Sequence, residues 1–195
     1  MAKIVISTNA SLDGVVQDPD GQEGFRLGGW FREFGGDDLD EWARLFTAEA
    51  LETDALLLGR RSDAWFASRW LGRSGEWADR LNSLPKYVVS ATLADAAWSN
   101  ATVLRGDVVD EVSQLKRTLD GEIAVFGSYQ LGRMLIEHDL IDEVRLVVFP
   151  VVLGAGERLF GETSDQKPVR LMGTETIGAG LVRMTYAVMP EKAAA

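Results

Sequence analysis

The stretch Ile123-Ala124-Val125-Phe126-Gly127-Ser128-Tyr129-Gln130 decides the fold of this 195-residue chain. Its first four residues are all apolar, which is typical of a buried strand in a parallel sheet, because both faces of such a strand are covered. Gly127 ends the strand, and we expect a helix over Ser128–Glu137. A strand followed directly by a helix is the repeating unit of an α/β fold.

Similar patterns run along the whole chain. Short apolar or β-rich runs predict about eight strands, over Lys3–Asn9, Ala55–Leu58, Tyr87–Val89, Ala101–Arg105, Ile123–Phe126, Val144–Val152, Val169–Ile177 and Leu181–Met189. Helical spacing predicts helices over about Leu39–Glu52, Val108–Leu119 and Ser128–Glu137. Asp37 or Asp38 can cap the first of these helices and Asp107 the second.

The remaining segments are expected to be turns and loops. Residues 18–36 contain seven Gly or Pro residues and predict a long loop. Gly178-Ala179-Gly180 suits the turn of a closing antiparallel hairpin. We therefore expect one α/β domain over residues 1–190, with a mostly parallel central sheet flanked by helices, and a frayed tail over residues 191–195.

Composition excludes several classes of protein. The net charge of −10 argues against nucleic acid or an anionic membrane as a partner. The chain has no cysteine, which excludes disulfides and thiolate zinc sites and suits a reducing compartment. It has neither a signal-peptide pattern nor eighteen consecutive apolar residues. We expect a soluble, cytoplasmic protein without a metal site.

Three of the expected strands end in polar or glycine-rich turns, and ligands of parallel sheets bind beyond such strand ends. The turns are Gly59-Arg60-Arg61-Ser62, Ser90-Ala91-Thr92 and Gly127-Ser128-Tyr129-Gln130. In the third turn, the free N–H groups at the start of a helix suit an anion such as a pyrophosphate. A tight turn without a ligand would explain Gly127 equally well.

Two common phosphate-binding motifs are excluded. Gly127 to Gly132 has the spacing of a P-loop, but Arg133-Met134 stands where the motif needs Lys-Ser or Lys-Thr. Gly154-Ala155-Gly156 lies too late in the chain for a Rossmann fingerprint, and Leu159 occupies the position of its third glycine.

Arg60 and Arg61 offer the positive charge that a phosphorylated cofactor needs. Adjacent arginines cannot both be buried in one core, and the planar guanidinium suits the 2′-phosphate of NADPH. A surface arginine pair in weak salt bridges is the alternative. A cofactor site is favoured only if this turn and the turn at Gly127 meet in the folded protein.

Five stretches in the order of the chain resemble the dihydrofolate-reductase-like superfamily. The resemblance is closer to the stand-alone relatives of the C-terminal reductase domain of the bifunctional riboflavin-biosynthesis deaminase-reductase. The stretches are Ser11-Leu12-Asp13-Gly14, Leu58-Gly59-Arg60-Arg61-Ser62, Val125-Phe126-Gly127-Ser128, Leu140-Ile141-Asp142-Glu143-Val144, and Phe149-Pro150-Val151-Val152-Leu153-Gly154-Ala155-Gly156 with Leu159-Phe160. The resemblance implies a dihydrofolate-reductase-like fold, NADPH along the carboxyl edge of the sheet, a small-molecule substrate and a homodimer.

Residue roles follow from the resemblance by position. Those implied for the cofactor are Gly59, Arg60, Arg61 and Ser62 at the adenosine phosphate, Ser90 near the adenine, Gly127, Ser128, Tyr129 and Gln130 at the pyrophosphate, and Pro150, Leu153 and Gly154 at the nicotinamide end. Asp13 is implied to face the substrate, and it is the candidate catalytic residue, acting as an orienting group or through a water. An ordinary Asp-Gly turn is the alternative for Asp13. Thr8 and Asn9 are further candidates for the pocket wall.

The resulting prediction is an NADPH-dependent reductase that transfers a hydride to a small heterocyclic or ribosylamino-pyrimidine-like metabolite. With one histidine and no cysteine, the chain has no zinc deaminase domain. Alternatives are a dihydrofolate reductase, a non-catalytic NADPH-binding module and an acidic interaction protein. Of the other residues, we expect His138 to cap a helix, Trp42 to pack in the core, and Trp30 and Phe31 to cover a substrate pocket.

Overall fold

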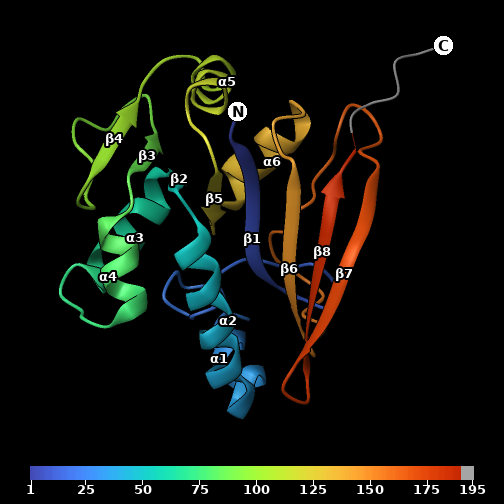
Figure 1. Ribbon diagram of the computed structural model, residues 1–195. Helices are drawn as coiled ribbons and strands as arrows, with labels where there is room; N and C mark the ends of the chain where they lie inside the picture. The colour runs from blue at the N-terminus through green and yellow to red at the C-terminus, as the bar shows by residue number, and fades with distance from the viewer. Residues whose placement is uncertain (190–195) are drawn as a thin grey trace.

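The buried apolar runs of the sequence form one eight-stranded sheet of order β4-β3-β2-β5-β1-β6-β8-β7 in the computed structural model, which describes residues 1–189 (Figure 1). The strands are β1 (Lys3–Ser11), β2 (Ala55–Gly59), β3 (Lys86–Val89), β4 (Ala101–Leu104), β5 (Glu122–Phe126), β6 (Glu143–Phe149), β7 (Val169–Ile177) and β8 (Leu181–Val188). Neighbouring strands from β4 to β6 are parallel, whereas β8 is antiparallel to both β6 and β7. The predicted mostly parallel sheet with a C-terminal hairpin is confirmed.

Helices cover both faces of the sheet. They are α1 (Trp30–Gly35), α2 (Leu39–Glu52), α3 (Arg60–Trp70), α4 (Glu76–Ser83), α5 (Val108–Thr118) and α6 (Tyr129–Glu137), with a short 3₁₀ helix, Gly36–Asp38, before α2. Alternation along β5 separates two core layers, since Ile123 and Val125 pack with α5 and α6, whereas Ala124 and Phe126 pack with α2, α3 and α4. Covering on both sides explains why the central strands are apolar at consecutive positions.

Several local predictions are corrected by the structure. The expected loop over residues 18–36 contains α1, and α3 begins at Arg60 directly after β2, where only a turn was expected. Asp38 does not cap α2; its carboxylate accepts the N–H groups of Ala179 and Gly180 in the β7–β8 turn. Asp107 does cap α5, as predicted. The predicted frayed tail, residues 191–195, lies outside the described residues.

A buried charged cluster fastens α2 to the sheet. Arg145 of β6 donates to Glu49 of α2 at 2.9 Å, to Glu122 at 2.7 Å and to Glu143 at 2.6 Å. The side chain of Glu49 is only 1% exposed. Burial alone would lower the pKa of Arg145, but its hydrogen bonds to Glu122 and Glu49 raise it. Lys3 also pairs with Glu143 at 2.6 Å and Arg183 with Glu49 at 3.4 Å, but Arg145 is the cation that all three carboxylates share.

Candidate functional site

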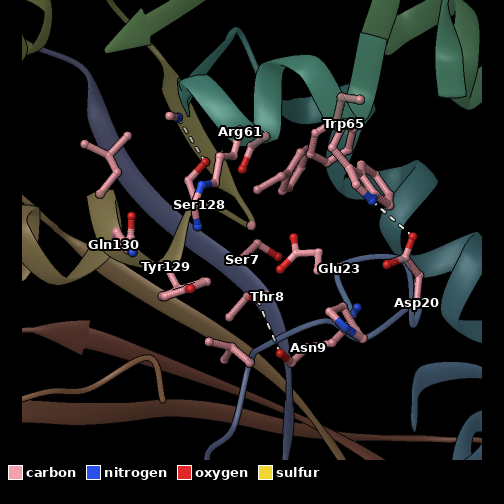
Figure 2. Close-up of a pocket in the computed structure, with 18 of the residues that line it drawn as sticks. Ser7, Thr8, Asn9, Asp20, Glu23, Arg61, Trp65, Ser128, Tyr129 and Gln130 are labelled. Atoms are coloured by element: carbon pink, nitrogen blue, oxygen red, sulfur yellow. Dashed lines mark hydrogen bonds between the residues drawn. The ribbon is translucent and has the colours of Figure 1, made fainter. Parts of the chain in front are cut away.

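The carboxyl half of β1 and the carboxyl ends of β2, β3 and β5 open onto one cavity of about 560 Å³ (Figure 2). The residues that these strands and the turns after them contribute are Ser7, Thr8, Asn9, Gly59, Val89, Ser90, Phe126 and Gly127. Figure 2 shows the β1 residues lying between Ser128 and Arg61 on one side and Asp20 on the other. The sheet therefore brings the three predicted turns to one edge, where ligands of parallel sheets bind.

One wall of the cavity is formed by the starts of α3 and α6. The Gly59 N–H before α3 donates to the Ser128 hydroxyl before α6 at 3.0 Å, so the two turns are in contact. Gly127 and Ser128 both have left-handed backbones, with φ of 61° and 55°. Since a β-carbon on Gly127 would meet nothing closer than the Ser62 hydroxyl at 3.6 Å, conformation rather than space favours glycine there.

The amino ends of α3 and α6 are open to a ligand. No side chain caps either helix. The first N–H groups of a helix have no partner within the helix and lie at the positive end of its dipole. Tyr129 and Gln130, at the start of α6, line the cavity. Two helix ends that face one cavity make a site suited to phosphate groups.

Arg60 and Arg61 both line this wall and both are exposed. Neither guanidinium has an ion pair with another side chain in residues 1–189. Figure 2 shows Arg61 on the same side of the cavity as Ser128. The positive charge of Arg60 and Arg61 is therefore available to an anionic ligand. Within the described residues, the two arginines do not form the surface salt bridges that were the alternative explanation.

The opposite wall is aromatic. Its members are Trp42 and Phe46 of α2, Trp65, Phe66 and Trp70 of α3, and Trp77 of α4. Trp42 stacks on Phe46 at 4.3 Å between ring centroids and donates its indole N–H to Asn9 Oδ1 at 2.8 Å. Trp42 thus packs inward, as predicted, and also lines the site.

Trp30 and Phe31, by contrast, do not line the cavity, so the prediction that they cover a pocket is wrong. Trp30 is 1% exposed and donates its N–H to the carbonyl of Gln17. Phe31 packs against Phe149 and Trp42 in the core.

An acidic loop that sequence reasoning missed forms part of the cavity wall. Asp18, Asp20 and Glu23 all contribute to the lining. Asp18 accepts the backbone N–H groups of Glu23 and Phe25, each at 3.0 Å. Asp20 accepts from the Trp65 indole at 3.1 Å (Figure 2) and from Arg69 at 2.8 Å, which ties the loop to α3. Burial, together with Asp18 and Asp20, raises the pKa of Glu23.

Asp13 lies outside the cavity wall, contrary to the expected position facing the substrate. Its carboxylate accepts from the Ser11 hydroxyl at 2.7 Å and from the backbone N–H groups of Leu153 and Gly154 at 3.1 and 2.9 Å. Burial alone would raise the pKa of Asp13, but these hydrogen bonds lower it to about 2. The carboxylate therefore ties the turn after β1 to the segment after β6. Pro150, Leu153 and Gly154 are likewise absent from the cavity wall.

Replacing Asp13 with alanine is expected to destabilise the protein by about 1–3 kcal/mol, because two backbone donors lose a charged acceptor. The stabilisation by Asp13 is present above the ordinary pKa near 3.8 and is lost as the pH falls toward 2. Urea unfolding at pH 7 and at pH 3 should therefore show a smaller deficit at the lower pH. A variant with normal stability and no turnover would instead restore Asp13 to the catalytic role.

Other predictions concern positions away from the cavity. His138 is the C-terminal cap residue of α6, as predicted. In residues 1–189 we find no group of three or more His, Cys, Asp or Glu side chains placed to hold a metal ion. The same part of the chain contains no helix long and apolar enough to cross a membrane.

Comparison with known sequences identifies a family. Residues 2–183 match the family described as the RibD C-terminal domain. Two relatives come from Bacillus subtilis. The uncharacterized protein YyaP is 29% identical over 149 residues, covering 72% of this chain and 77% of the relative. The uncharacterized protein YwjB is 26% identical over 176 residues, covering 90% and 92%.

Solved structures with the same fold cover nearly the whole chain. A putative riboflavin biosynthesis protein from Shewanella sp. PV-4 has a TM-score of 0.76 and 24% identity, covering 97% of this chain and 99% of that one. A pyrimidine reductase-like protein from Corynebacterium diphtheriae has a TM-score of 0.66 and 14% identity, covering 97% and 93%. A diaminohydroxyphosphoribosylaminopyrimidine deaminase/5-amino-6-(5-phosphoribosylamino)uracil reductase from Thermotoga maritima has a TM-score of 0.62 and 13% identity, covering 96% of this chain and 57% of that one. The predicted resemblance and the predicted fold are both confirmed.

Proposed function

The chain belongs to the RibD C-terminal domain family, and we propose that it is an NADPH-dependent reductase of a small heterocyclic metabolite. Membership of this family supports a reductase-type role. The observation that carries the proposal is that two unpaired arginines and the uncapped start of α6 line one cavity. Positive charge and free N–H groups in one place suit a dinucleotide.

The donors present fit the phosphates of NADPH. Arg60 and Arg61 offer planar guanidinium groups to the 2′-phosphate, and the N–H groups of Tyr129 and Gln130 would hold the pyrophosphate. Ser90 lines the same cavity, where it would lie near the adenine. A hydrogen bond to a charged group contributes about 1.5–3 kcal/mol, so one arginine is enough for roughly ten-fold preference over NADH.

The chain's own residues would orient the substrate and exclude water. NADPH supplies the hydride when bound, and transfer requires the acceptor atom to be held against the nicotinamide. Ser7, Thr8 and Asn9 of β1 line the cavity, where they can position polar groups of the substrate. The aromatic wall opposite lowers the local dielectric, which strengthens these polar contacts.

Folate reduction is not favoured over other heterocycles. The folate enzymes use a carboxylate on the first long helix, and none of the carboxylates of α2 lines the cavity. Glu41 accepts the Gly178 N–H, and Glu49 pairs with Arg145. Binding of methotrexate would instead favour a folate as the substrate.

The proposal is tested by titrating the protein with NADPH and with NADH while following tryptophan fluorescence. Four of the six tryptophans line the cavity, so binding should change the signal. We expect tighter binding of NADPH. Binding of neither nucleotide at millimolar concentration would refute the proposed function, and NADPH binding without oxidation of any offered heterocycle would favour a non-catalytic module.

We further propose that the protein is a homodimer, as its family resemblance implies. Strand β7 is exposed at every position except Ile177, and Val169 and Leu171 are 48% and 52% exposed. An apolar edge strand is costly to leave in water and suits pairing with a second copy. The molar mass in solution, measured by light scattering, should be twice the mass of one chain. In the Leu171→Lys variant, the molar mass should fall toward that of one chain. A monomeric parent at tens of micromolar would contradict the proposal.

A further inference from the structure

The two ends of the cavity differ in charge. Arg60 and Arg61 are the only cationic side chains among the described residues that line it, and both lie at the phosphate-binding end. Asp18, Asp20 and Glu23 also line the cavity, and the charges of Arg61 and Arg69 act on Glu23. If the arginines hold the cofactor phosphates, no basic side chain remains on the described wall to neutralise a phosphate on the substrate.

The far end of the cavity is shaped for a flat ring. Trp42, Phe46, Trp70 and Trp77 contribute to its wall, and their rings pack on one another, with 5.7 Å between the centroids of Trp42 and Trp77 and 4.7 Å between those of Trp70 and Trp77. Offset and edge contacts between aromatic rings favour a planar π-system over an aliphatic one.

Glu23 is the acid best placed to act on a ligand. Asp18 and Asp20 are occupied by the hydrogen bonds that hold the loop, whereas the Glu23 carboxylate accepts no hydrogen bond from the described chain. Figure 2 shows Glu23 pointing toward Ser7 and Thr8 at the middle of the cavity. An anionic substituent on a bound ring would meet this carboxylate.

We infer that the aromatic end of the cavity binds a planar heterocycle without a phosphate group, and that Glu23 excludes phosphorylated analogues. This inference rests on the proposed function, because it assigns Arg60 and Arg61 to the cofactor. It separates this chain from the Thermotoga maritima protein, whose name specifies a phosphoribosylamino substituent.

The test compares two probes, 5-amino-6-(5-phosphoribosylamino)uracil and its dephosphorylated ribosylamino form, by calorimetry in the presence of saturating NADP⁺. The parent protein should bind the dephosphorylated form at least about ten-fold more tightly, because juxtaposed like charges are strongly unfavourable. Glu23→Lys should bring the ratio of the two affinities to about one or reverse it. Glu33→Lys, on the exposed side of α1, is the matched control and should leave the ratio unchanged.

Tighter binding of the phosphorylated form by the parent, binding of neither form, or an unchanged ratio in Glu23→Lys would each overturn the inference. Trp77→Leu removes one aromatic ring from the wall and should weaken binding of the dephosphorylated probe by about ten-fold, with NADP⁺ binding unchanged. Equal affinity in Trp77→Leu and the parent would contradict the role of the aromatic wall. If NADP⁺ does not bind, the proposed function is refuted. The ratio of the affinities for the two probes, measured without NADP⁺, then tests the inference separately.

Discussion

Replacement of both Arg60 and Arg61 by alanine is expected to weaken NADPH binding by at least about ten-fold while leaving NADH binding within about two-fold of the parent. The two nucleotides differ only in the 2′-phosphate, and a charged hydrogen bond to it contributes about 1.5–3 kcal/mol. Both guanidinium groups line the cavity and have no ion pair in the described chain, so no intramolecular salt bridge is lost with them. Calorimetry with each nucleotide measures the two affinities.

Arg117→Ala is the matched control for this pair. Arg117 is an exposed arginine on α5, which lies on the other side of the sheet from α3. It should leave both affinities unchanged. An equal loss of NADPH and NADH in the double variant would show that the arginines support the fold of the site rather than read the 2′-phosphate.

Replacement of Arg145 by methionine is expected to cost about 3–5 kcal/mol of the free energy of unfolding at pH 7, because a buried charge that loses its partner is strongly destabilising. The substitution removes the closest cation from Glu49, whose side chain is 1% exposed, and leaves it only Arg183 at 3.4 Å. Glu143 keeps Lys3 at 2.6 Å. Urea unfolding monitored by circular dichroism measures the loss, and Arg44→Met on the exposed side of α2 should change little.

The loss in Arg145→Met should depend on pH in a defined direction. In the parent, burial would raise the pKa of Glu143, but hydrogen bonds from Lys3 and Arg145 lower it. Its stabilising contribution is therefore present at neutral pH and is lost as the pH falls. Without Arg145, Glu143 loses one of the two donors that lower its pKa and protonates at a higher pH than in the parent, so the deficit should narrow between pH 7 and pH 5. A deficit that widens on acidification would contradict this explanation, and adding Glu49→Leu to the variant should recover part of the stability.

The sheet was predictable from sequence because its strands are buried on both faces. Leu56, Leu57 and Leu58 are each fully buried, and a short run of consecutive apolar residues between turn signals is typical of such a strand. The helices α2, α5 and α6 were predictable because their apolar faces repeat with helical spacing. The N-terminal half of α3, by contrast, begins with Arg60-Arg61-Ser62-Asp63, which has the composition of a turn.

The candidate site was predictable only in part. The turns at Arg60 and Gly127 carry local signals of phosphate binding, and the sheet does bring them together. The aromatic and acidic walls carry no local signal, because they depend on where α4 and the loop over residues 16–23 fold relative to α3. Asp13 shows the converse problem, since its Asp-Gly turn suits a catalytic carboxylate and a structural one equally well until the Leu153 and Gly154 contacts are known.

The most direct measurement is a crystal structure of the protein with NADPH. We predict that the 2′-phosphate contacts Arg60 or Arg61, that the pyrophosphate lies at the start of α6 against the N–H groups of Tyr129 and Gln130, and that the nicotinamide reaches β1 near Thr8. NADPH bound elsewhere on the molecule, or a cavity rim without cofactor at saturating NADPH, would contradict the proposed dinucleotide site.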